Sequence, residues 1–193
     1  IMNEALSRKG LNLSTKLSIH IVGVGGAGMR AIALVLASMG HSITGSDLKS
    51  SAGLDRLEAS GVKVTIGHDR QNVGQVDLVA RSTAVSDRNI EIKEAHHRKI
   101  TVVSRADLLS AITRIKPTIS VAGTHGKTTT SSMLAVLLAQ AGLNPSFIIG
   151  GEVNEIGCGA LWEAGSSLFV VEADESDGTF LTLDSEYGII TNI

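Results

Sequence analysis

The strongest constraint on the fold is a strand, a glycine-rich turn and a helix that follow one another between residues 118 and 141. The apolar run at 118–122 is typical of a buried strand, and apolar residues recur at helical spacing over 127–141. A tight turn, Gly123-Thr124-His125-Gly126, separates them. Glycines let backbone N–H groups approach an anion, and a helix N-terminus carries partial positive charge. The pattern therefore predicts a phosphate-binding loop.

The side chains of this loop predict how ATP and Mg²⁺ would be held. Lys127 is placed to reach the β- and γ-phosphates, and the Thr128 hydroxyl is placed to ligate the metal. The loop is shorter than a Walker A loop, because Val121 stands where that motif has its first glycine. His125 either contacts the phosphate or the acceptor, or fills the turn. The candidate ATP-binding residues are Gly123, Thr124, His125, Gly126, Lys127, Thr128 and Thr129, with Lys127 and His125 as the catalytic candidates.

An acidic segment follows a later apolar strand at 168–172. That strand ends in Glu172, and Asp174, Glu175 and Asp177 come directly after it. Mg²⁺ prefers oxygen ligands, usually one or two carboxylates with phosphates and water. The predicted metal ligands are therefore Thr128 and Glu172, in a site that positions phosphates and neutralises charge during phosphoryl transfer. The alternative for the acidic cluster is a solvated, helix-capping turn.

A second glycine motif lies near the N-terminus. Residues 23–28 read Gly-Val-Gly-Gly-Ala-Gly, which is G-x-G-x-x-G between a strand at 17–24 and a helix that runs to about residue 39. Gly40 is the expected C-cap, and the next strand, 41–47, ends in Asp47. This βαβ pattern predicts a diphosphate at the helix N-terminus and Asp47 at a ribose, without identifying the nucleotide. The alternative for Asp47 is a solvated turn or a helix N-cap.

Strands and helices continue to alternate after this unit. Helices are predicted at 54–60, 89–98 and 105–114, and strands at 62–66, 77–82 and 101–103. Such alternation predicts a doubly wound parallel sheet with ligands at the carboxyl ends of its strands. Residues 25–28, Asp47, 82–84 and Arg105 would then face one crevice. His96 and His97 are expected at the surface, whereas the role of His68 stays open.

Lys116-Pro117 is the predicted domain boundary, because proline disfavours a helical conformation in the residue before it. Residues 1–16 are mixed in polarity and are expected to form a poorly ordered lead-in. A Rossmann-like α/β domain is expected at 17–116 and a second α/β unit at 117–193. The second unit should have strands at 146–149, 168–172 and 187–191, with a turn at 150–154.

Composition excludes several classes of protein. The net charge is −2 and aromatic residues make up 3%, so the chain has neither a basic field nor a stacking platform for nucleic acid. No run approaches the roughly 18 apolar residues that cross a membrane. The single cysteine, Cys158, is expected to be a small apolar filler in a reduced compartment.

Four segments together resemble the Mur ligase family. They are residues 23–29, Gly45-Ser46-Asp47, residues 122–130 and residues 172–178. The resemblance implies cytoplasmic bacterial enzymes of peptidoglycan precursor synthesis, which use ATP and Mg²⁺ to convert a carboxylate into an acyl phosphate that an amine attacks. The carboxylate would be that of UDP-N-acetylmuramate and the amine L-alanine. It also implies a Rossmann-like UDP-sugar domain followed by the start of a P-loop-type ATPase domain.

The resemblance also implies roles for individual residues. Lys127 and Thr128 would bind ATP phosphates and metal, and Glu172 would be a metal ligand. The candidate UDP-sugar residues are Gly25, Gly26, Ala27, Gly28, Met29, Asp47, Ser82, Thr83 and Arg105. The family continues well past residue 193, so this chain alone is expected to bind the UDP-sugar without completing the ligation.

Two readings outside this family and one within it compete. A nicotinamide-dependent oxidoreductase would fit residues 23–47 alone, but it has no need for a second phosphate site. The other reading outside the family is a non-catalytic nucleotide-binding module. Within the family, ligases that attach a recycled peptide are the near neighbours, and the Gly-Gly-Ala-Gly-Met sequence favours those that use L-alanine. The sequence indicates no oligomeric state.

Overall fold

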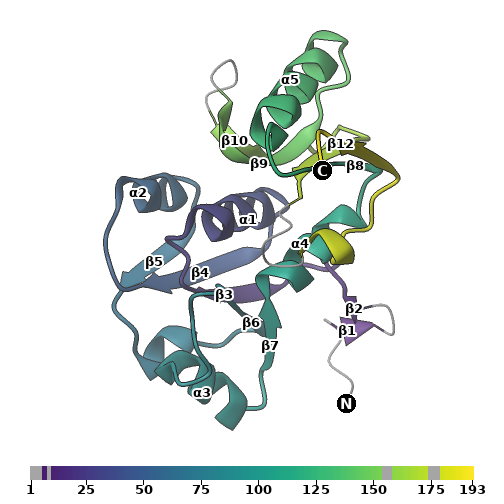
Figure 1. Cartoon of the computed structure of the whole chain (residues 1–193). Helices are drawn as coiled ribbons and strands as arrows, with labels where there is room; N and C mark the ends of the chain where they lie inside the picture. The colour runs from purple at the N-terminus through teal and green to yellow at the C-terminus, as the bar shows by residue number, and fades with distance from the viewer. Residues whose placement is uncertain (1–5, 8–9, 154–157, 174–178) are drawn as a thin grey trace. The chain divides into compact units, whose positions relative to one another are not determined.

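The computed structural model describes residues 6–7, 10–153, 158–173 and 179–193. They form two compact units, Ile1–Leu108 and Leu109–Ile193, each built around its own five-stranded sheet (Figure 1). Each is an α/β unit, as predicted. In the described part of the chain, none of the helices has both the length and the apolar character needed to cross a membrane.

The first unit is the predicted doubly wound parallel sheet. Its strand order is β5-β4-β3-β6-β7, and all four pairings are parallel. The order reverses beside β3, which makes the carboxyl end of β3 the switch point where such sheets bind ligands. The elements are β1 Leu6–Ser7, β2 Gly10–Leu11, β3 Ser18–Val22, α1 Ala27–Ser38, β4 Ser42–Asp47, α2 Ala52–Ala59, β5 Lys63–Ile66, the 3-10 helix η1 Arg70–Val73, β6 Leu78–Arg81, α3 Ile90–His97 and β7 Thr101–Ser104. Helix α4, Arg105–Thr113, begins in this unit and ends in the second.

The core of this unit explains why these segments become strands and helices. Ile19, Ile21 and Val22 of β3 are fully buried, as expected for a central parallel strand whose two faces are both covered. Helix α1 buries a stripe of apolar residues at helical spacing, among them Met29 and Ile32. Helix α1 ends near residue 39 as predicted, but its C-cap is Met39 rather than Gly40. Gly40 follows with a φ of +89°, and its N–H donates to Ala37 O.

The expectation of a poorly ordered lead-in at 1–16 is wrong for the part of it that the structure describes. Strands β1 and β2 pair antiparallel, and Leu11 and Leu13 are each only 6% exposed. The Lys16 ammonium donates to Met39 O after helix α1. Leu11 and Leu13 alternate with a polar residue, so an extended chain turns both leucines to one side, where they cover apolar core.

The second unit has the strand order β10-β9-β11-β8-β12. Strands β9, β11, β8 and β12 are parallel, and β10 is antiparallel to β9. Its core contains Ala135, Phe147, Ile149 and Val170. The elements that follow α4 are β8 Thr118–Ala122, α5 Lys127–Gln140, β9 Ser146–Val153, β10 Cys158–Leu161, β11 Phe169–Glu172, the 3-10 helix η2 Thr179–Thr182 and β12 Tyr187–Ile190.

The turn predicted at 150–154 is wrong over its described residues, 150–153. Strand β9 continues to Val153 and pairs with β10, which the sequence did not predict. Gly150 is needed for close approach rather than for turning, because its N–H donates to Glu172 Oε2 at 2.8 Å. A Cβ at Gly150 would lie 2.9 Å from that oxygen. Asn154 lies outside the described residues.

Candidate functional site

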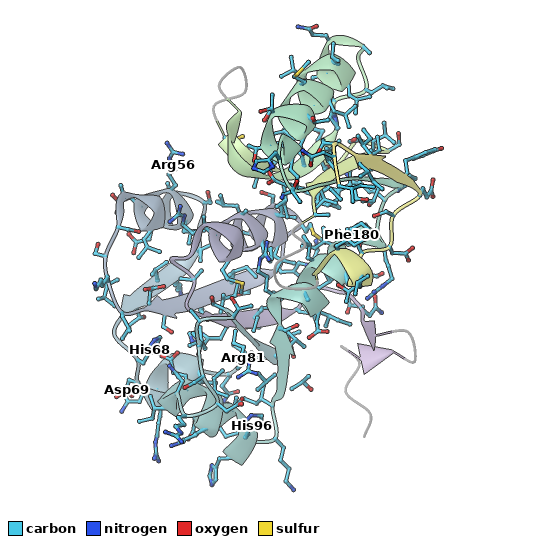
Figure 2. All side chains as sticks on the ribbon, in the orientation of Figure 1. Arg56, His68, Asp69, Arg81, His96 and Phe180 are labelled. Carbon is cyan, nitrogen blue, oxygen red and sulfur yellow. The ribbon has the colours of Figure 1, made fainter. Side chains whose placement is uncertain are left out.

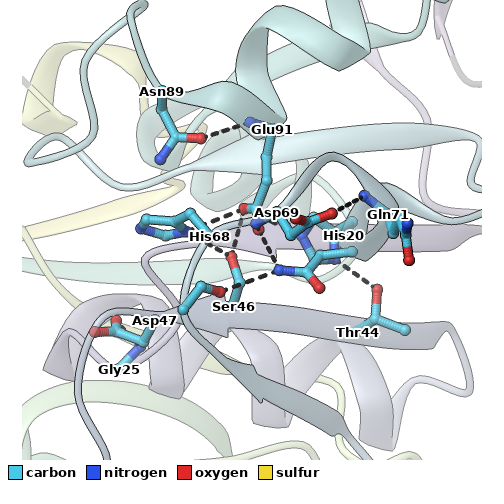
Figure 3. A network of polar contacts seen from close by, with 12 residues as sticks. His20, Gly25, Thr44, Ser46, Asp47, His68, Asp69, Gln71, Asn89 and Glu91 are labelled. Atoms are coloured by element: carbon cyan, nitrogen blue, oxygen red, sulfur yellow. Dashed lines mark hydrogen bonds and ion pairs between the residues drawn. The ribbon is translucent and has the colours of Figure 1, made fainter.

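The glycine loop of the first unit connects β3 to α1 and is held by the end of β4. Gly23 N and Val24 N both donate to Ser46 O, at 2.8 and 3.1 Å. Gly25 N donates to Asp47 Oδ2 at 2.8 Å (Figure 3). Gly26 is the N-cap of α1, and no side chain caps that helix. The N-terminus of α1 is therefore available to an anion, as the motif predicts.

The glycines of this loop differ in the atoms that a side chain at each position would meet. A Cβ at Gly25 would lie 2.7 Å from Asp47 Oδ2, and one at Gly28 would lie 2.8 Å from Arg105 Nε. At Gly26 the nearest atom is a backbone oxygen at 3.8 Å, so the protein itself leaves that side open. Gly25 and Gly28 let the polar side chains approach the loop, whereas Gly26 leaves room for a ligand.

The structure brings most of the predicted UDP-sugar residues to this edge of the sheet. Asp47 ends β4, Arg105 follows β7, and Ser82 follows β6 with its N–H donating to Val22 O at 3.0 Å. Ala27 and Thr83 are exposed beside them. Met29 is different, because its side chain is only 2% exposed and packs in the core. Only the backbone of Met29 is therefore available to a ligand.

A buried polar network centred on Glu91 lies behind this edge, and sequence reasoning missed it (Figure 3). The Glu91 side chain is fully buried. Its carboxylate accepts from Ser46 Oγ at 2.5 Å and from Asn72 Nδ2 at 2.6 Å. His68 Nδ1 lies 3.2 Å from Oε2, and His20 Nε2 makes a longer contact of 3.5 Å with the same oxygen. The network joins β3, β4, η1 and α3.

The Glu91 carboxylate is ionised in this setting. Burial alone would raise its pKa, but contacts from His20, Ser46 and Asn72 and the charge of His20 outweigh burial and hold the pKa at about 2. In the sequence, Glu91 reads only as an acid in the first turn of a helix whose N-cap is Asn89. No local pattern distinguishes it from a solvated residue.

The phosphate-binding loop of the second unit has the predicted strand, turn and helix. Strand β8 ends at Ala122, and α5 begins at Lys127 without a side-chain cap. Gly123 and Gly126 have φ values of +130° and +82°, which L side chains rarely adopt. Lys127 Nζ donates to Gly123 O at 2.6 Å, so its ammonium lies across the loop that phosphates would enter.

The segment after β12 holds this loop through hydrogen bonds that no sequence pattern predicts. Asn192 Oδ1 accepts from Thr124 Oγ1 at 2.9 Å and from His125 N at 3.0 Å. Thr191 Oγ1 donates to His125 O at 2.6 Å. The side chain of His125 is exposed, with Nδ1 at 3.2 Å from Thr124 Oγ1. Both roles considered for His125 remain compatible with that position.

The two predicted metal ligands lie side by side. Thr128 Oγ1 is 3.1 and 3.0 Å from the two carboxylate oxygens of Glu172. A hydroxyl and a carboxylate next to a phosphate loop fit Mg²⁺, which takes few protein oxygens together with phosphates and water. The described residues contain no group of three or more His, Cys, Asp or Glu side chains that would form a metal site without a phosphate. Asp174, Glu175 and Asp177 lie outside the described residues.

The histidines on α3 and the histidine after β5 differ in exposure. His96 and His97 are exposed on α3, as expected for surface residues. Figure 2 shows His96 at this surface. His68 lies on the loop after β5, and its side chain is 15% exposed. It belongs to the Glu91 network and therefore to the edge that carries Asp47.

Two family models match almost the whole chain. Residues 18–116 match the model of the Mur ligase family, catalytic domain, and residues 121–193 match that of the Mur ligase middle domain. A UDP-N-acetylmuramate–L-alanine ligase of Geobacter sulfurreducens is 49% identical over 91% of this chain and 38% of its own length. The corresponding ligase of Dechloromonas aromatica is 50% identical, with the same coverage of both chains. This chain thus spans less than half the length of these curated relatives.

Solved structures of ligases with similar names also match this chain. A UDP-N-acetylmuramate-alanine ligase from Thermotoga maritima has a TM-score of 0.84 and 32% identity, over 91% of this chain and 41% of that one. A UDP-N-acetylmuramate:L-alanyl-gamma-D-glutamyl-meso-diaminopimelate ligase from Neisseria meningitides also has a TM-score of 0.84, with 29% identity over 92% of this chain and 61% of that one.

Proposed function

The chain belongs to the Mur ligase family, and from that premise we propose that it acts in the ATP-dependent joining of L-alanine to UDP-N-acetylmuramate. The observation that carries the proposal is the presence of two glycine loops, each leading into a helix whose N-terminus has no side-chain cap. One loop is accompanied by Asp47 and the other by Lys127, Thr128 and Glu172. A nicotinamide-dependent oxidoreductase needs only the first of these loops.

The first unit is proposed to hold the UDP-sugar. The backbone of residues 25–29 receives the diphosphate at the N-terminus of α1, where the helix dipole favours negative charge. Asp47 accepts from a ribose hydroxyl, and Ser82, Thr83 and Arg105 contact the phosphates or the sugar. Support comes from the carboxyl-end positions of these residues and from the open space beside Gly26.

The second unit is proposed to hold ATP and Mg²⁺. The sugar carboxylate would take the γ-phosphoryl group of ATP and release ADP, and the amine of L-alanine would then displace phosphate to form the amide. Bound Mg²⁺ would supply charge neutralisation for the phosphates. Lys127 turns from Gly123 O to the β- and γ-phosphates, and Gly123, Gly126 and residues 124–129 supply backbone N–H groups and hydroxyls. Thr128 and Glu172, whose oxygens lie 3.0 to 3.1 Å apart, would hold the metal. His125 is proposed to contact the γ-phosphate from its exposed position.

Calorimetric titration of the 193-residue chain tests the proposal. We expect micromolar binding of UDP-N-acetylmuramate and no heat from NADH. ATP with Mg²⁺ should bind to the wild type and lose affinity in Lys127→Ala, while Lys93→Ala, at an exposed position of α3, serves as the control. Binding of NADH together with no response to the UDP-sugar would overturn the proposal.

A further inference from the structure

The guanidinium group of Arg30 reaches back from helix α1 to the glycine loop that precedes the helix. Arg30 is the fourth residue of α1, and its Nη1 donates a hydrogen bond to Gly25 O at 2.7 Å. The N–H of the same glycine donates to Asp47 Oδ2 at 2.8 Å (Figure 3). The peptide groups before and after Gly25 are therefore held by two side chains of opposite charge, one from α1 and one from β4.

The contact with Arg30 sets the direction of the next N–H group in the loop. In a trans peptide the C=O and the N–H point in opposite directions. Because Arg30 holds Gly25 O, the N–H of Gly26 points away from the guanidinium group. Gly26 is exposed, and its N–H finds no acceptor among the described residues. The loop thus presents this N–H as a donor at the N-terminus of α1.

Helix α2 leaves the space that the Arg30 side chain occupies. A Cβ at Gly53, the second residue of α2, would lie 2.5 Å from Arg30 Cζ and 2.6 Å from both Nε and Nη1. Glycine is a poor helix former, and Gly53 has no positive φ that would call for it. The absent side chain at Gly53 is therefore matched to the guanidinium group, which packs against the backbone of α2.

The charge of Arg30 is placed where an anion would offset it. A cation near a helix N-terminus opposes the helix dipole, and the first turn of α1 contains neither an acidic residue nor a side-chain cap. A second guanidinium group is close to the same loop, because a Cβ at Gly28 would lie 2.8 Å from Arg105 Nε. Two cations and the single carboxylate of Asp47 therefore lie at this loop, a balance that favours a phosphate ligand.

We propose that Arg30, packed against Gly53, is a positioning residue for the diphosphate: it turns the peptide between Gly25 and Gly26 so that Gly26 N–H donates to a phosphate oxygen. The proposal rests on the proposed binding of a UDP-sugar. Without the guanidinium group this peptide is free to rotate, and ordering it would reduce the free energy gained on binding. A loss of affinity for UDP of about tenfold is the expected consequence.

A double-mutant cycle tests whether Gly53 acts through Arg30. Calorimetry gives the dissociation constant of UDP for the wild-type 193-residue chain, Arg30→Ala, Gly53→Ala and the double variant. Each single variant should weaken UDP about tenfold, because the methyl group at residue 53 displaces the guanidinium group. The double variant should bind like Arg30→Ala, since no guanidinium group is left to displace. Arg98→Ala, which removes an exposed arginine after α3, is the control and should bind like the wild type.

The direction of the Gly26 N–H can be followed in ¹H–¹⁵N spectra of the same chain. Saturating UDP should move the Gly26 amide proton downfield in the wild type, and by less in Arg30→Ala and Gly53→Ala. Arg30→Lys, which keeps a charged donor, should recover part of both the affinity and the shift. An equal downfield shift in Arg30→Ala would show that the N–H faces the phosphate without Arg30, and would overturn the proposal.

The outcomes separate this proposal from the proposed function. If the wild type binds UDP and Arg30→Ala binds it equally well, the assignment of Arg30 falls and the UDP-sugar function stands. The same holds if Gly53→Ala weakens UDP equally with and without Arg30. If the wild type binds no UDP, the function and the assignment fall together. Thermal unfolding identifies any general loss of fold, and Gly53→Ala, which raises helix propensity, should unfold no earlier than the wild type.

Discussion

Two neighbouring glycines in the loop before α1, Gly25 and Gly26, differ in what an added methyl group would contact. At Gly25 it would enter the space of the Asp47 carboxylate, whereas at Gly26 it would meet no protein atom closer than 3.8 Å. Gly26 also has a φ of −64°, which any residue adopts. Among the described residues nothing requires a glycine at this position, which supports the proposal that a diphosphate lies there.

Gly26→Ala should leave the free energy of unfolding within about 1 kcal/mol of the wild type, because the new methyl group contacts nothing. The same variant should weaken UDP-N-acetylmuramate at least about tenfold by narrowing the entrance to the helix N-terminus. Urea unfolding and calorimetry measure the two effects. Gly188→Ala, at another open and unstrained glycine, is the control. Unchanged binding by Gly26→Ala would contradict a diphosphate at this position.

The lowered pKa of Glu91 predicts how the free energy of unfolding changes in acid. Its pKa in the folded protein is about 2, well below its ordinary value of 4.5, so its contribution to stability is complete above pH 4.5 and is lost as the pH falls toward 2. That contribution is about 3 kcal/mol. Urea unfolding at several pH values should therefore show Glu91→Gln less stable than wild type at pH 7, with the difference shrinking below pH 4.5. Glu58→Gln, at an exposed position of α2, should show no such convergence.

Among the elements, the loop between β8 and α5 depends on the segment after β12, which lies far away in the sequence. Thr191 and Asn192 hold it through His125 O, His125 N and Thr124 Oγ1. A Cβ at Gly123 would collide with Thr191 Oγ1, whereas one at Gly126 would be 3.9 Å from the nearest atom. The two glycines share a positive φ but differ in crowding.

Gly126→Ala should therefore cost about 1–2 kcal/mol of unfolding free energy from backbone strain alone. Gly123→Ala should cost more, because the strain is joined by displacement of Thr191 and the hydrogen bonds that it makes. Chemical unfolding of the two variants beside Gly188→Ala gives the order. Equal losses at Gly123 and Gly126 would show that the segment after β12 does not press on the loop.

The sequence predicts elements whose cause is local and misses those whose cause is distant. The strand at 118–122 and the helix predicted at 127–141 follow from apolar periodicity and glycine placement, and the structure confirms them, with the helix ending at Gln140. The continuation of β9 through Gly150 depends on Glu172, 22 residues away, so a glycine pair was misread as a turn. The candidate site divides in the same way. Gly25 and Asp47 follow from a motif, whereas the Glu91 network and Asn192 arise only when distant segments meet.

At the scale of the whole molecule, each unit has its own sheet and its own glycine loop. Ligands that bind the native state slow the opening of the segments they contact. Hydrogen exchange should therefore show that UDP-N-acetylmuramate protects amides around residues 23–29 and 47, and that ATP with Mg²⁺ protects residues 123–130. Protection of 123–130 by the UDP-sugar alone would mean that the roles of the two loops are assigned wrongly.

The contacts of Thr191 and Asn192 also set an order of events during synthesis. Both residues emerge from the ribosome after the loop that they fasten, which lies 66 to 69 residues earlier in the chain. Contacts so distant in sequence form late, because the chain between them must first be ordered. The loop therefore reaches its final form only once β12 has paired with β8. If this loop binds ATP as proposed, affinity for ATP should appear only after that pairing has formed.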